Sequence, residues 1–516
     1  MAGEGKSGIG WGTGEIVFAV VLLTALSGGP QFLSDPGTFW HARLGREILE
    51  TGRVPRSDNL TFTRPNAPWV DQSWAFDVAL AAVVQRWGWP AAVGLSALLL
   101  AALYGWMARE LVRDGVAPIV AGGVTILAAW IGTMHFLVRP HLVTFALFAI
   151  TLRCCQLQHE RGGWRIAWIP PLMVVWANSH GGFLAGIIVV ATAAAACAAA
   201  GPWDQQRRVE VAKFGLILAA CLFAPLINPY AVGLYWHVAQ FISGEAALTR
   251  EFEPIRFGRG QAWLVELVVM LLIAAPTFLG KRMDAYQLAH TIVWLHLALT
   301  SIRHAPLFAI AAAPGLARLL DVSAGRSPIA ASERRLGGSP WVLGTAAIVL
   351  LGVLAGYPFA RFDEQRWPLR TLEVLNRQPV SDRLFHEFDW GGLIESECRP
   401  PRLAFIDDRC ELFGRTAVAE YVEALEGGPG WDRLRDRHRI DLVWIRPDRG
   451  LARRLEAEPG WTLLGGDEVS RLYSRSLGSL EPPAARDSQI APPTSLGEPH
   501  VARSGGRLER RSPWPK

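Results

Sequence analysis

Residues 35–74 read DPGTFWHARLGREILETGRVPRSDNLTFTRPNAPWVDQSW, a polar and aromatic segment between two long apolar runs. The run before it is Ile16–Leu33, and the run after it is Trp89–Ala108. At about 1.5 Å per residue, helices of this length can cross about 30 Å of hydrocarbon. The pattern therefore predicts that residues 34–88 form a loop between two membrane spans.

Apolar runs of the same kind recur along the first 360 residues and give about eleven candidate spans. Ala167–Ala177 is the weakest, because it is short and contains Pro170 and Pro171. The runs predict an α-helical polytopic membrane domain over residues 1–361. They lie at Ile16–Leu33, Trp89–Ala108, Val116–Met134, Pro140–Leu157, Ala167–Ala177, Phe183–Ala200, Val211–Ile227, Ala262–Leu279, Ala285–Ser301, Ala305–Leu319 and Pro340–Pro358.

A polar segment follows the last apolar run. The 516-residue chain is 51% hydrophobic, and its mean hydropathy of +0.21 is too low for a chain that is all membrane. Residues 362–475 carry a net charge of −4, whereas residues 1–361 carry +7. Helical and strand-like patterns alternate in residues 362–475, which predicts a small α/β domain. The helical patterns lie at Pro368–Arg377 and Ala417–Glu426, and the strand-like runs at Arg402–Ile406, Leu442–Ile445 and Ser470–Tyr473. Residues 476–516 are rich in Pro, Ser, Gly and Arg, and we expect a disordered tail.

The basic residues indicate an orientation rather than a nucleic-acid partner. Only four of the 51 basic residues are lysine, and no basic run alternates with aromatic residues, so nucleic-acid binding is excluded. With a cytoplasmic N-terminus, the short outer connections hold only Arg139 and Arg303. The positive-inside rule therefore predicts a cytoplasmic N-terminus and an extracytoplasmic C-terminal domain. The sequence also contains no phosphate-binding glycine-rich loop, which argues against ATP-driven chemistry.

Under this orientation, polar side chains gather on the outer side of the membrane domain. They come from the ends of different spans, and ionisable groups that converge at a membrane surface are a site hypothesis. The alternative is that polar residues simply occupy surface connections. The set comprises Asp35, His41, His135, Arg139, His141, Asn178, His180, Asn228, Tyr230, Glu251, Glu253, Arg303 and His304.

Asp35 stands first in the quoted loop, just beyond the first span. Phe39, Leu44 and Ile48 have helical spacing, which predicts a short amphipathic helix in the membrane interface with Trp40 at headgroup depth. A carboxylate at that depth can accept a proton from a hydroxyl group or bind Mg²⁺ or Mn²⁺. An Asp before a Pro also fits a helix N-cap, so the local pattern leaves both interpretations of Asp35 open.

The order D-P-x-x-F-W-H-x-R, then a Gly-Arg-x-Pro turn and Asp58, resembles the first outer loop of the GT-C superfamily of membrane glycosyltransferases. Within it, the pattern is most similar to oligosaccharyltransferase catalytic subunits and to bacterial polyprenyl-phosphate-sugar transferases. Residues 385–396, FHEFDWGGLIES, and 403–409, LAFIDDR, are loosely similar to the acceptor-contacting W-W-D-Y-G region of oligosaccharyltransferases. Only Asp389 and Gly391 match that motif.

The resemblance implies a GT-C hexosyltransferase of a bacterial inner membrane. Such an enzyme moves a sugar from a polyprenyl-phosphate donor to a periplasmic glycan, lipid or protein acceptor. Asp35 would be the catalytic acid or base, and a metal ligand if Mg²⁺ or Mn²⁺ is used, with Glu251 as a second acid. Asp389 and Trp390 would contact the acceptor, although a structural role in the small domain fits them as well. The implied donor-binding residues are Arg139, Arg303, His41, His141, His180 and Asn178.

Two other classes of protein remain open. They are a transporter or flippase with an outer accessory domain, and a non-catalytic scaffold of the cell envelope. Transporters often show internal repeats and polar residues at mid-membrane. Here no repeat is visible and the polar set lies at one surface, which favours the enzyme.

Two features of the small domain also have open interpretations. Cys398 and Cys410 can pair in an oxidising compartment. Asp407, Asp408 and Arg409 follow a strand-like run and can form a small polar cluster, although carboxylates at the end of a strand are often only turn formers.

Overall fold

The computed structural model describes residues 12–242, 252–258, 260–322, 340–354, 361–380 and 383–475. The chain forms two compact units. The first, which we call the helical body, comprises Met1–Trp367 and Asp389–Ala417. The second, the sheet unit, comprises Pro368–Phe388 and Val418–Lys516. Residues 389–417, expected in the small domain, thus group with the helices, and the predicted disordered tail lies outside the described residues.

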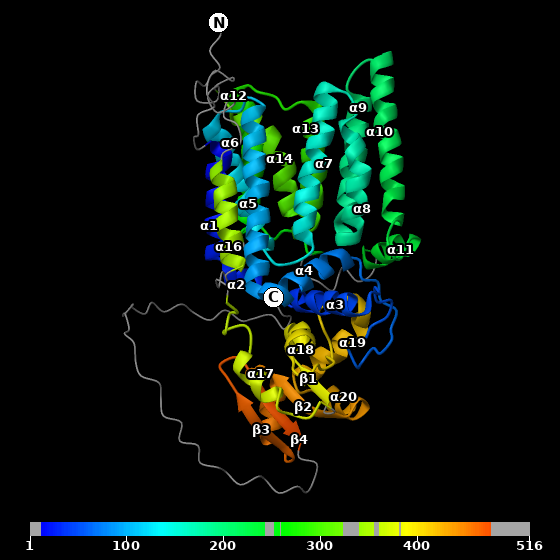
Figure 1. Cartoon of the computed structure of the whole chain (residues 1–516), viewed down its shortest axis with the longest axis vertical. Coiled ribbons are helices and arrows are strands. Elements are labelled where there is room, and N and C mark those ends of the chain that lie inside the picture. Colours follow the sequence, from blue (N-terminus) through cyan, green and yellow to red (C-terminus); the bar gives the residue numbers. More distant parts are fainter. Residues whose placement is uncertain are drawn as a thin grey trace, which may run out of the picture. The chain divides into compact units, whose positions relative to one another are not determined.

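Each predicted apolar run coincides with a helix of the helical body (Figure 1). The helices at these runs are α1 (Thr13–Ser27) with α2 (Gly29–Phe32), α5 (Trp89–Arg113), α6 (Pro118–Gly132), α7 (His141–Arg161), α8 (Ile169–Ser179), α9 (Leu184–Ala199), α10 (Gln205–Phe223), α12 (Ala262–Leu279), α13 (Ala285–Thr300), α14 (Ala305–Leu320) and α16 (Pro340–Leu354). Short helices continue several of them: η1 (Thr133–His135), η2 (Arg165–Trp168), η3 (Gly181–Phe183), η4 (Ala224–Leu226), α11 (Val232–Gln240) and η8 (Ile302–His304).

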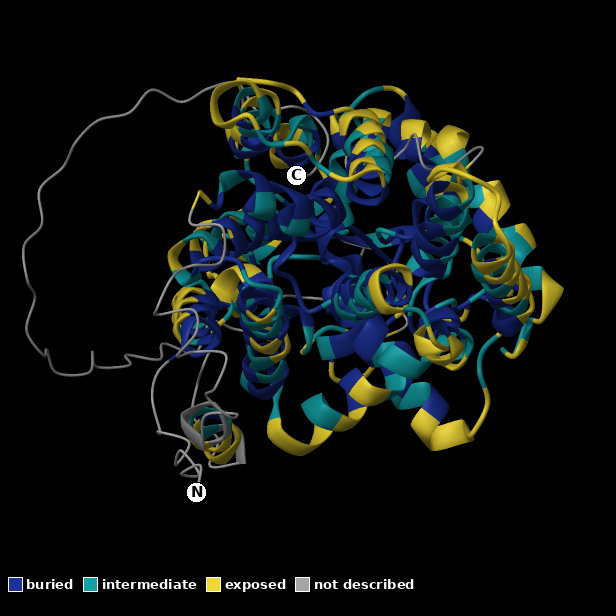
Figure 2. Cartoon of the chain, turned by 90° about the horizontal axis from the view of Figure 1, so that it is seen from above, coloured by how far each residue is buried: buried dark blue, intermediate teal, exposed yellow. Residues whose placement is uncertain are grey.

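Six of these helices, with their adjoining turns, are long and apolar enough to cross a membrane. They are Trp89–Arg113, Pro118–His135, His141–Arg161, Gly181–Ala199, Gln205–Leu226 and Ala262–Leu279. The protein is therefore a multi-pass membrane protein, but the predicted count of about eleven spans is not confirmed. In Figure 2, exposed residues lie on the outward faces of the helices. Apolar side chains there, such as Phe223 at 69% and Phe278 at 83% exposure, suit contact with lipid.

The predicted amphipathic helix of the first loop exists, but its apolar face is covered by protein. It is α3 (Gly37–Thr51), and α4 (Trp74–Trp87) packs against it across one end of the helical body (Figure 1). A Cβ atom on Gly45 would lie 1.8 Å from the Asp77 carbonyl oxygen, so only glycine permits this approach of α3 to α4. Trp40 is 6% exposed, so protein rather than solvent or lipid covers it, and its depth in the membrane stays a prediction.

Residues 389–417 are fastened to the first loop by backbone pairing. The Ala404 N–H donates to the Leu60 carbonyl at 2.9 Å, and the Phe62 N–H donates to the Ala404 carbonyl at 3.1 Å. The expected strand Arg402–Ile406 is thus an isolated bridge to the first loop, because its pairing partner is Thr61 rather than the sheet. This segment contains α18 (Gly391–Glu397) and the start of α19 (Cys410–Leu425). Its two cysteines, Cys398 and Cys410, are not joined in a disulfide, so the pairing considered from the sequence is not formed.

The sheet unit contains a four-stranded sheet in the order β1-β2-β4-β3. Strand β1 is parallel to β2, and the other neighbours are antiparallel. Two predicted strands, at Leu442–Ile445 and Ser470–Tyr473, are confirmed as β2 and β4. The bounds are β1 (Arg383–His386), β2 (Ile440–Ile445), β3 (Trp461–Gly466), β4 (Arg471–Arg475), α17 (Leu369–Leu375), α20 (Gly430–His438) and α21 (Gly450–Ala457), with η9 (Phe388–Trp390) at the junction of the units.

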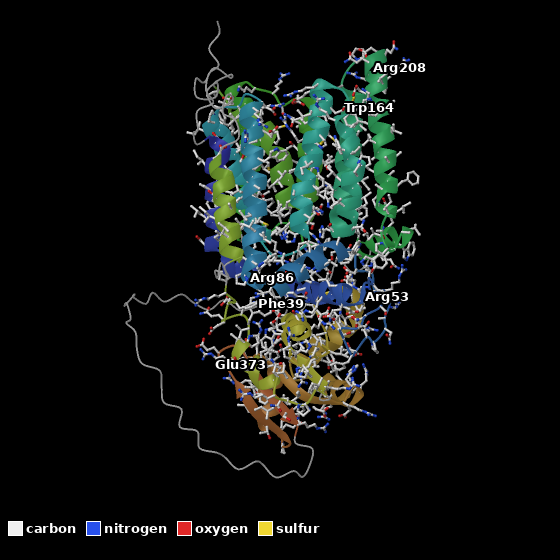
Figure 3. All side chains as sticks on the ribbon, in the orientation of Figure 1. Phe39, Arg53, Arg86, Trp164, Arg208 and Glu373 are labelled. Atoms are coloured by element: carbon white, nitrogen blue, oxygen red, sulfur yellow. The ribbon has the colours of Figure 1, made fainter. Side chains whose placement is uncertain are left out.

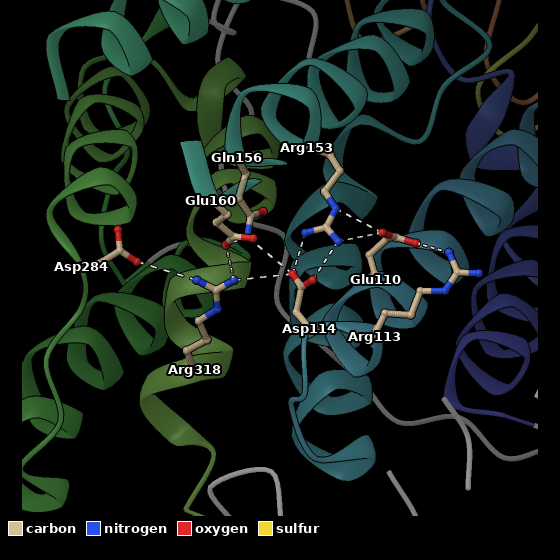
Figure 4. Close-up of polar contacts among 8 residues, drawn as sticks. All are labelled: Glu110, Arg113, Asp114, Arg153, Gln156, Glu160, Asp284 and Arg318. Carbon is tan, nitrogen blue, oxygen red and sulfur yellow. Dashed lines mark hydrogen bonds and ion pairs between the residues drawn. The ribbon is translucent and has the colours of Figure 1, made fainter. Parts of the chain in front are cut away.

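An ion-pair network lies at the end of the helical body away from α3 (Figure 4). Arg153 on α7 contacts Glu110 at 2.8 Å and Asp114 at 2.6 Å, both at the end of α5. Arg318 on α14 contacts Glu160 at 2.8 Å. We call this the Arg153 network, and it ties three helices together. Figure 3 shows Arg208 and Trp164 at this end of the body, and Phe39, Arg53 and Arg86 at the other.

Candidate active site

Asp35 both caps α3 and forms an ion pair. It lies between α2 and α3, at the end of the helical body that we call the α3 end. Its Oδ1 atom accepts a hydrogen bond from the Gly37 N–H at 2.8 Å. Its Oδ2 atom accepts one from Nη1 of Arg139, just before α7, at 3.1 Å. The Oδ1 contact supports the helix-cap interpretation, and the catalytic role of Asp35 stays a prediction.

A second carboxylate, Asp408, approaches the same arginine. Its Oδ2 atom lies 3.8 Å from Nη2 of Arg139, and its Oδ1 atom accepts a hydrogen bond from Nε1 of Trp40 at 2.6 Å. A Cβ atom on Gly37 would lie 3.0 Å from Asp35 and 2.7 Å from Asp408, so the two acids flank this glycine. Burial raises the pKa of Asp408 to about 8; the Asp35 and Asp407 carboxylates add to the rise and Arg139 opposes it. Asp408 is therefore mostly protonated at neutral pH.

Arg409 positions Asp408. Its guanidinium donates to Asp407 at 2.5 Å and to Asp58 at 2.8 Å, and all three side chains are buried. It also lies 4.9 Å from the ring centroid of Trp69, a cation–π contact. Because Asp58 belongs to the first loop, Arg409 locks the loop to residues 407–409.

The sequence left Asp408 open between a small polar cluster and a turn former, and did not place it with the candidate site residues. Trp40, its hydrogen-bond partner, is 368 positions away, so no local pattern connects the two. The sequence signal that could have identified Asp408 is the pair of acids and the arginine directly after a strand-like run.

His41 lies next to Trp40, in a buried polar group. Its Nδ1 atom is 2.7 Å from Oδ1 of Asp77 and 3.4 Å from Oγ of Ser73. Burial lowers the pKa of His41, and the charge of Arg139 lowers it further, so the imidazole is neutral. Burial raises the pKa of Asp77 well above its usual range and that of Asp71 to about 6. The ring of His41 packs against that of Trp40 at a tilt of 31°, with centroids 3.7 Å apart, so His41 supports the residue that holds Asp408.

His180 and Arg303 form a pair of hydrogen-bond donors. Nδ1 of His180 accepts from the Gly182 N–H at 3.1 Å and lies 2.7 Å from Oγ1 of Thr144. The ring proton therefore lies on Nε2, which is 3.5 Å from Nη2 of Arg303. Burial lowers the pKa of His180, as does the nearby Arg303 charge. Two donors side by side suit a shared acceptor such as a phosphate oxygen.

The structure brings most of the predicted donor-binding residues to the α3 end. Arg139, His141 and His180 lie close enough to His41 for their charges to lower its pKa. Nε2 of His141 donates to the His135 carbonyl at 2.6 Å. The Asn178 amide has a different role, because it accepts from Nε1 of Trp74 and donates to the Val174 and Ile227 carbonyls, all at 2.8 Å. Asn178 thus ties α8 to α4.

The remaining predicted site residues lie elsewhere. Glu251, the suggested second acid, lies outside the described residues. Asp389 and Trp390 belong to the helical body and are 4% and 0% exposed. Such burial favours packing over contact with an acceptor, and their acceptor-binding role stays a prediction.

The described residues do not fit a divalent metal centre. Within the described part of the chain, no three His, Cys, Asp or Glu side chains converge as metal ligands do. Each of the two acids beside Arg139 has one oxygen engaged by an N–H donor, Gly37 for Asp35 and Trp40 for Asp408. Arg139 faces the other oxygen of each. We therefore derive no catalytic step through a metal.

Comparison with known proteins identifies the fold. No protein-family model and no curated protein matches the sequence. The oligosaccharyltransferase of Archaeoglobus fulgidus in its apo form matches with a TM-score of 0.53 at 12% identity, over 84% of this chain and 69% of that chain. The complex of that enzyme with an inhibitory peptide and a dolichol-phosphate gives 0.47, at 12% identity over the same shares. A mycobacterial arabinofuranosyltransferase gives 0.48 at 16% identity, over 89% of this chain and 41% of that one.

Over most of its length, the chain thus shares the fold of the archaeal oligosaccharyltransferase. The likeness to the apo oligosaccharyltransferase confirms, at the level of the fold, the resemblance expected from residues 35–74. It does not assign a reaction, which rests on the residues at the α3 end.

Proposed function

We propose that this protein is a membrane glycosyltransferase that moves a sugar from a polyprenyl-phosphate donor to an acceptor at the α3 end. One observation carries the proposal: Asp35 is paired with Arg139 at the end of a GT-C body where Arg303 and His180 also lie. This arrangement offers a carboxylate for the acceptor and fixed positive charge for a phosphate. Arginine suits the second task because its planar guanidinium is permanently charged and can bind phosphate through two hydrogen bonds.

The reaction is a displacement at the anomeric carbon of the sugar. The acceptor hydroxyl oxygen forms a bond to that carbon as the bond from the carbon to the phosphate oxygen breaks. The hydroxyl proton passes to Asp35, and the bonding electron pair leaves with the polyprenyl phosphate. Negative charge then grows on the phosphate, where Arg139 and Arg303 stabilise it because their positions are fixed in advance.

The fold and the surroundings of the site support the proposed donor and acceptor classes. Helices with exposed apolar faces can hold a prenyl chain beside a polar end. The archaeal enzyme with this fold has been captured with a dolichol-phosphate, a lipid-linked phosphate of this kind. We propose a hexosyl donor and a periplasmic glycan, lipid or protein acceptor, in a bacterial inner membrane with the α3 end outside.

The test is Asp35→Asn in the native host, with glycolipids and surface glycans profiled by mass spectrometry. The amide keeps the shape of the side chain but cannot take the acceptor proton. We expect one glycan or glycolipid to lose a sugar while the protein level stays normal. Glu50→Gln, on the exposed end of α3, is the matched control and should leave the profile unchanged. An unchanged profile for Asp35→Asn would contradict the proposal.

A further inference from the structure

Arg139 lies where two acids of the site converge, as a metal ion does in other carboxylate sites. Nη1 is 3.1 Å from Oδ2 of Asp35, and Nη2 is 3.8 Å from Oδ2 of Asp408. We propose that the guanidinium of Arg139 takes the place of a divalent cation, so that this protein needs no metal for transfer. The inference rests on the proposed function for the reaction itself, but the charge replacement can be tested separately.

The hydrogen bonds of the two acids support the replacement. Octahedral cations such as Mg²⁺ need several oxygen ligands at about 2.1 Å. Here Oδ1 of Asp35 is engaged by the Gly37 N–H, and Oδ1 of Asp408 by Nε1 of Trp40. A metal would have to share these oxygens with the Gly37 and Trp40 N–H groups. The arginine instead uses the one oxygen that each acid presents to it.

The charges around Arg139 also balance without a metal. Arg139 carries a fixed positive charge between the carboxyl groups of Asp35 and Asp408. Its ion pair with Asp35 carries no net charge. A divalent cation at the same two oxygens would compete with this fixed guanidinium.

Three neighbouring acids have partners of their own. Asp407 and Asp58 both bind Arg409, and Asp77 contacts His41. These contacts hold the first loop and Trp40 in place. The side chain of Arg139 is 23% exposed, which leaves it reachable for a donor phosphate.

The experiment measures both metal binding and transfer on the purified full-length protein. Mn²⁺ binding is followed by electron paramagnetic resonance for the wild type, Arg139→Ala and the double variant Arg139→Ala/Asp35→Asn. We expect no stoichiometric Mn²⁺ in the wild type, a new Mn²⁺ site in Arg139→Ala, and its loss in the double variant. Arg43→Ala, which removes a guanidinium on α3, is the control and should bind none. Transfer by the wild type should survive EDTA within about twofold, whereas removing fixed charge from the phosphate site should cost Arg139→Ala about 100-fold or more.

The outcomes separate the two proposals. Stoichiometric Mn²⁺ in the wild type that Asp35→Asn abolishes, or EDTA-sensitive transfer restored by Mn²⁺, would overturn the replacement. If Arg139→Ala does not fold, Arg139→Lys takes its place. This variant keeps a positive charge and should bind no Mn²⁺. Mn²⁺ binding by the wild type then decides whether the replacement holds. If no transfer is found but the Mn²⁺ pattern holds, the replacement stands and the proposed function fails.

Discussion

Two arginines of the helical body each lie between two carboxylates, one near either end of α7. Arg153 makes four hydrogen bonds to Glu110 and Asp114, between 2.6 and 3.1 Å, and its side chain is 11% exposed. Arg139 contacts its acids at 3.1 and 3.8 Å and is 23% exposed. The Arg153 network is closed and joins helices, whereas the Arg139 pair is looser and reachable. The same residue types therefore hold the fold at one end and can bind a ligand at the other.

The largest effect on stability is expected at the closed end. Asp114→Asn removes the negative charge of a side chain that is 5% exposed. The positive charges of Arg153 and Arg318 then lose a carboxylate that neutralises them. Breaking a buried pair on one side costs about 3 kcal/mol or more. We expect a clear fall in the thermal midpoint of the purified protein, with transfer unchanged below it.

Asp284→Asn is the matched control, because this acid is 49% exposed and 3.8 Å from Arg318. Exposed pairs are worth about 1 kcal/mol or less. If both variants shift the midpoint equally, burial is not what distinguishes the Arg153 network.

A smaller effect, on binding, is expected at Arg303. Arg303→Gln removes a charged donor beside His180 and should weaken the donor phosphate by about 1.5 to 3 kcal/mol, about 10- to 100-fold in KM. Titration of a polyprenyl-phosphate sugar measures this change. Arg256→Gln is the control, since its side chain is 65% exposed and pairs with Glu253. An equal rise in KM for both variants would show that general positive charge, not position, binds the donor.

The smallest effect concerns the protonation of Asp408. Because its pKa is raised to about 8, the acid is neutral below that pH and ionises above it. The new negative charge beside Arg139 should weaken phosphate binding, so we expect transfer to fall about threefold between pH 7.5 and 9. Asp408→Asn keeps the oxygen that accepts from Trp40 and should flatten this profile. A wild-type profile identical to that of Asp408→Asn would show that Asp408 does not titrate in this range.

The sequence predicts what depends on local pattern. The apolar runs locate the helices, and the ends of those helices bring Asp35 and Arg139 to one side, as expected from topology. The predicted helix at Phe39–Ile48 is also confirmed. Its apolar face is covered by protein rather than by the predicted membrane interface, because periodicity shows an apolar face without showing what covers it.

What escapes the sequence depends on contacts between distant segments. Arg402–Ile406 has the composition of a strand, yet its partner is Thr61 in the first loop rather than the sheet. The same contact carries Asp408 to Trp40. A single sequence cannot show such pairing, since the two segments share no period, charge pattern or motif.

The most direct test of the account compares the two ends in one reaction. Purified wild type, Asp35→Asn and Asp114→Asn are each mixed with excess acceptor and a radiolabelled polyprenyl-phosphate sugar, below their thermal midpoints, in a single-turnover assay. We predict that Asp35→Asn slows transfer by about 10²- to 10⁴-fold, the usual contribution of a general base, while Asp114→Asn stays within about twofold of the wild type. Transfer by Asp35→Asn at the wild-type rate, or its loss in Asp114→Asn alone, would contradict the assignment of the α3 end as the reacting site.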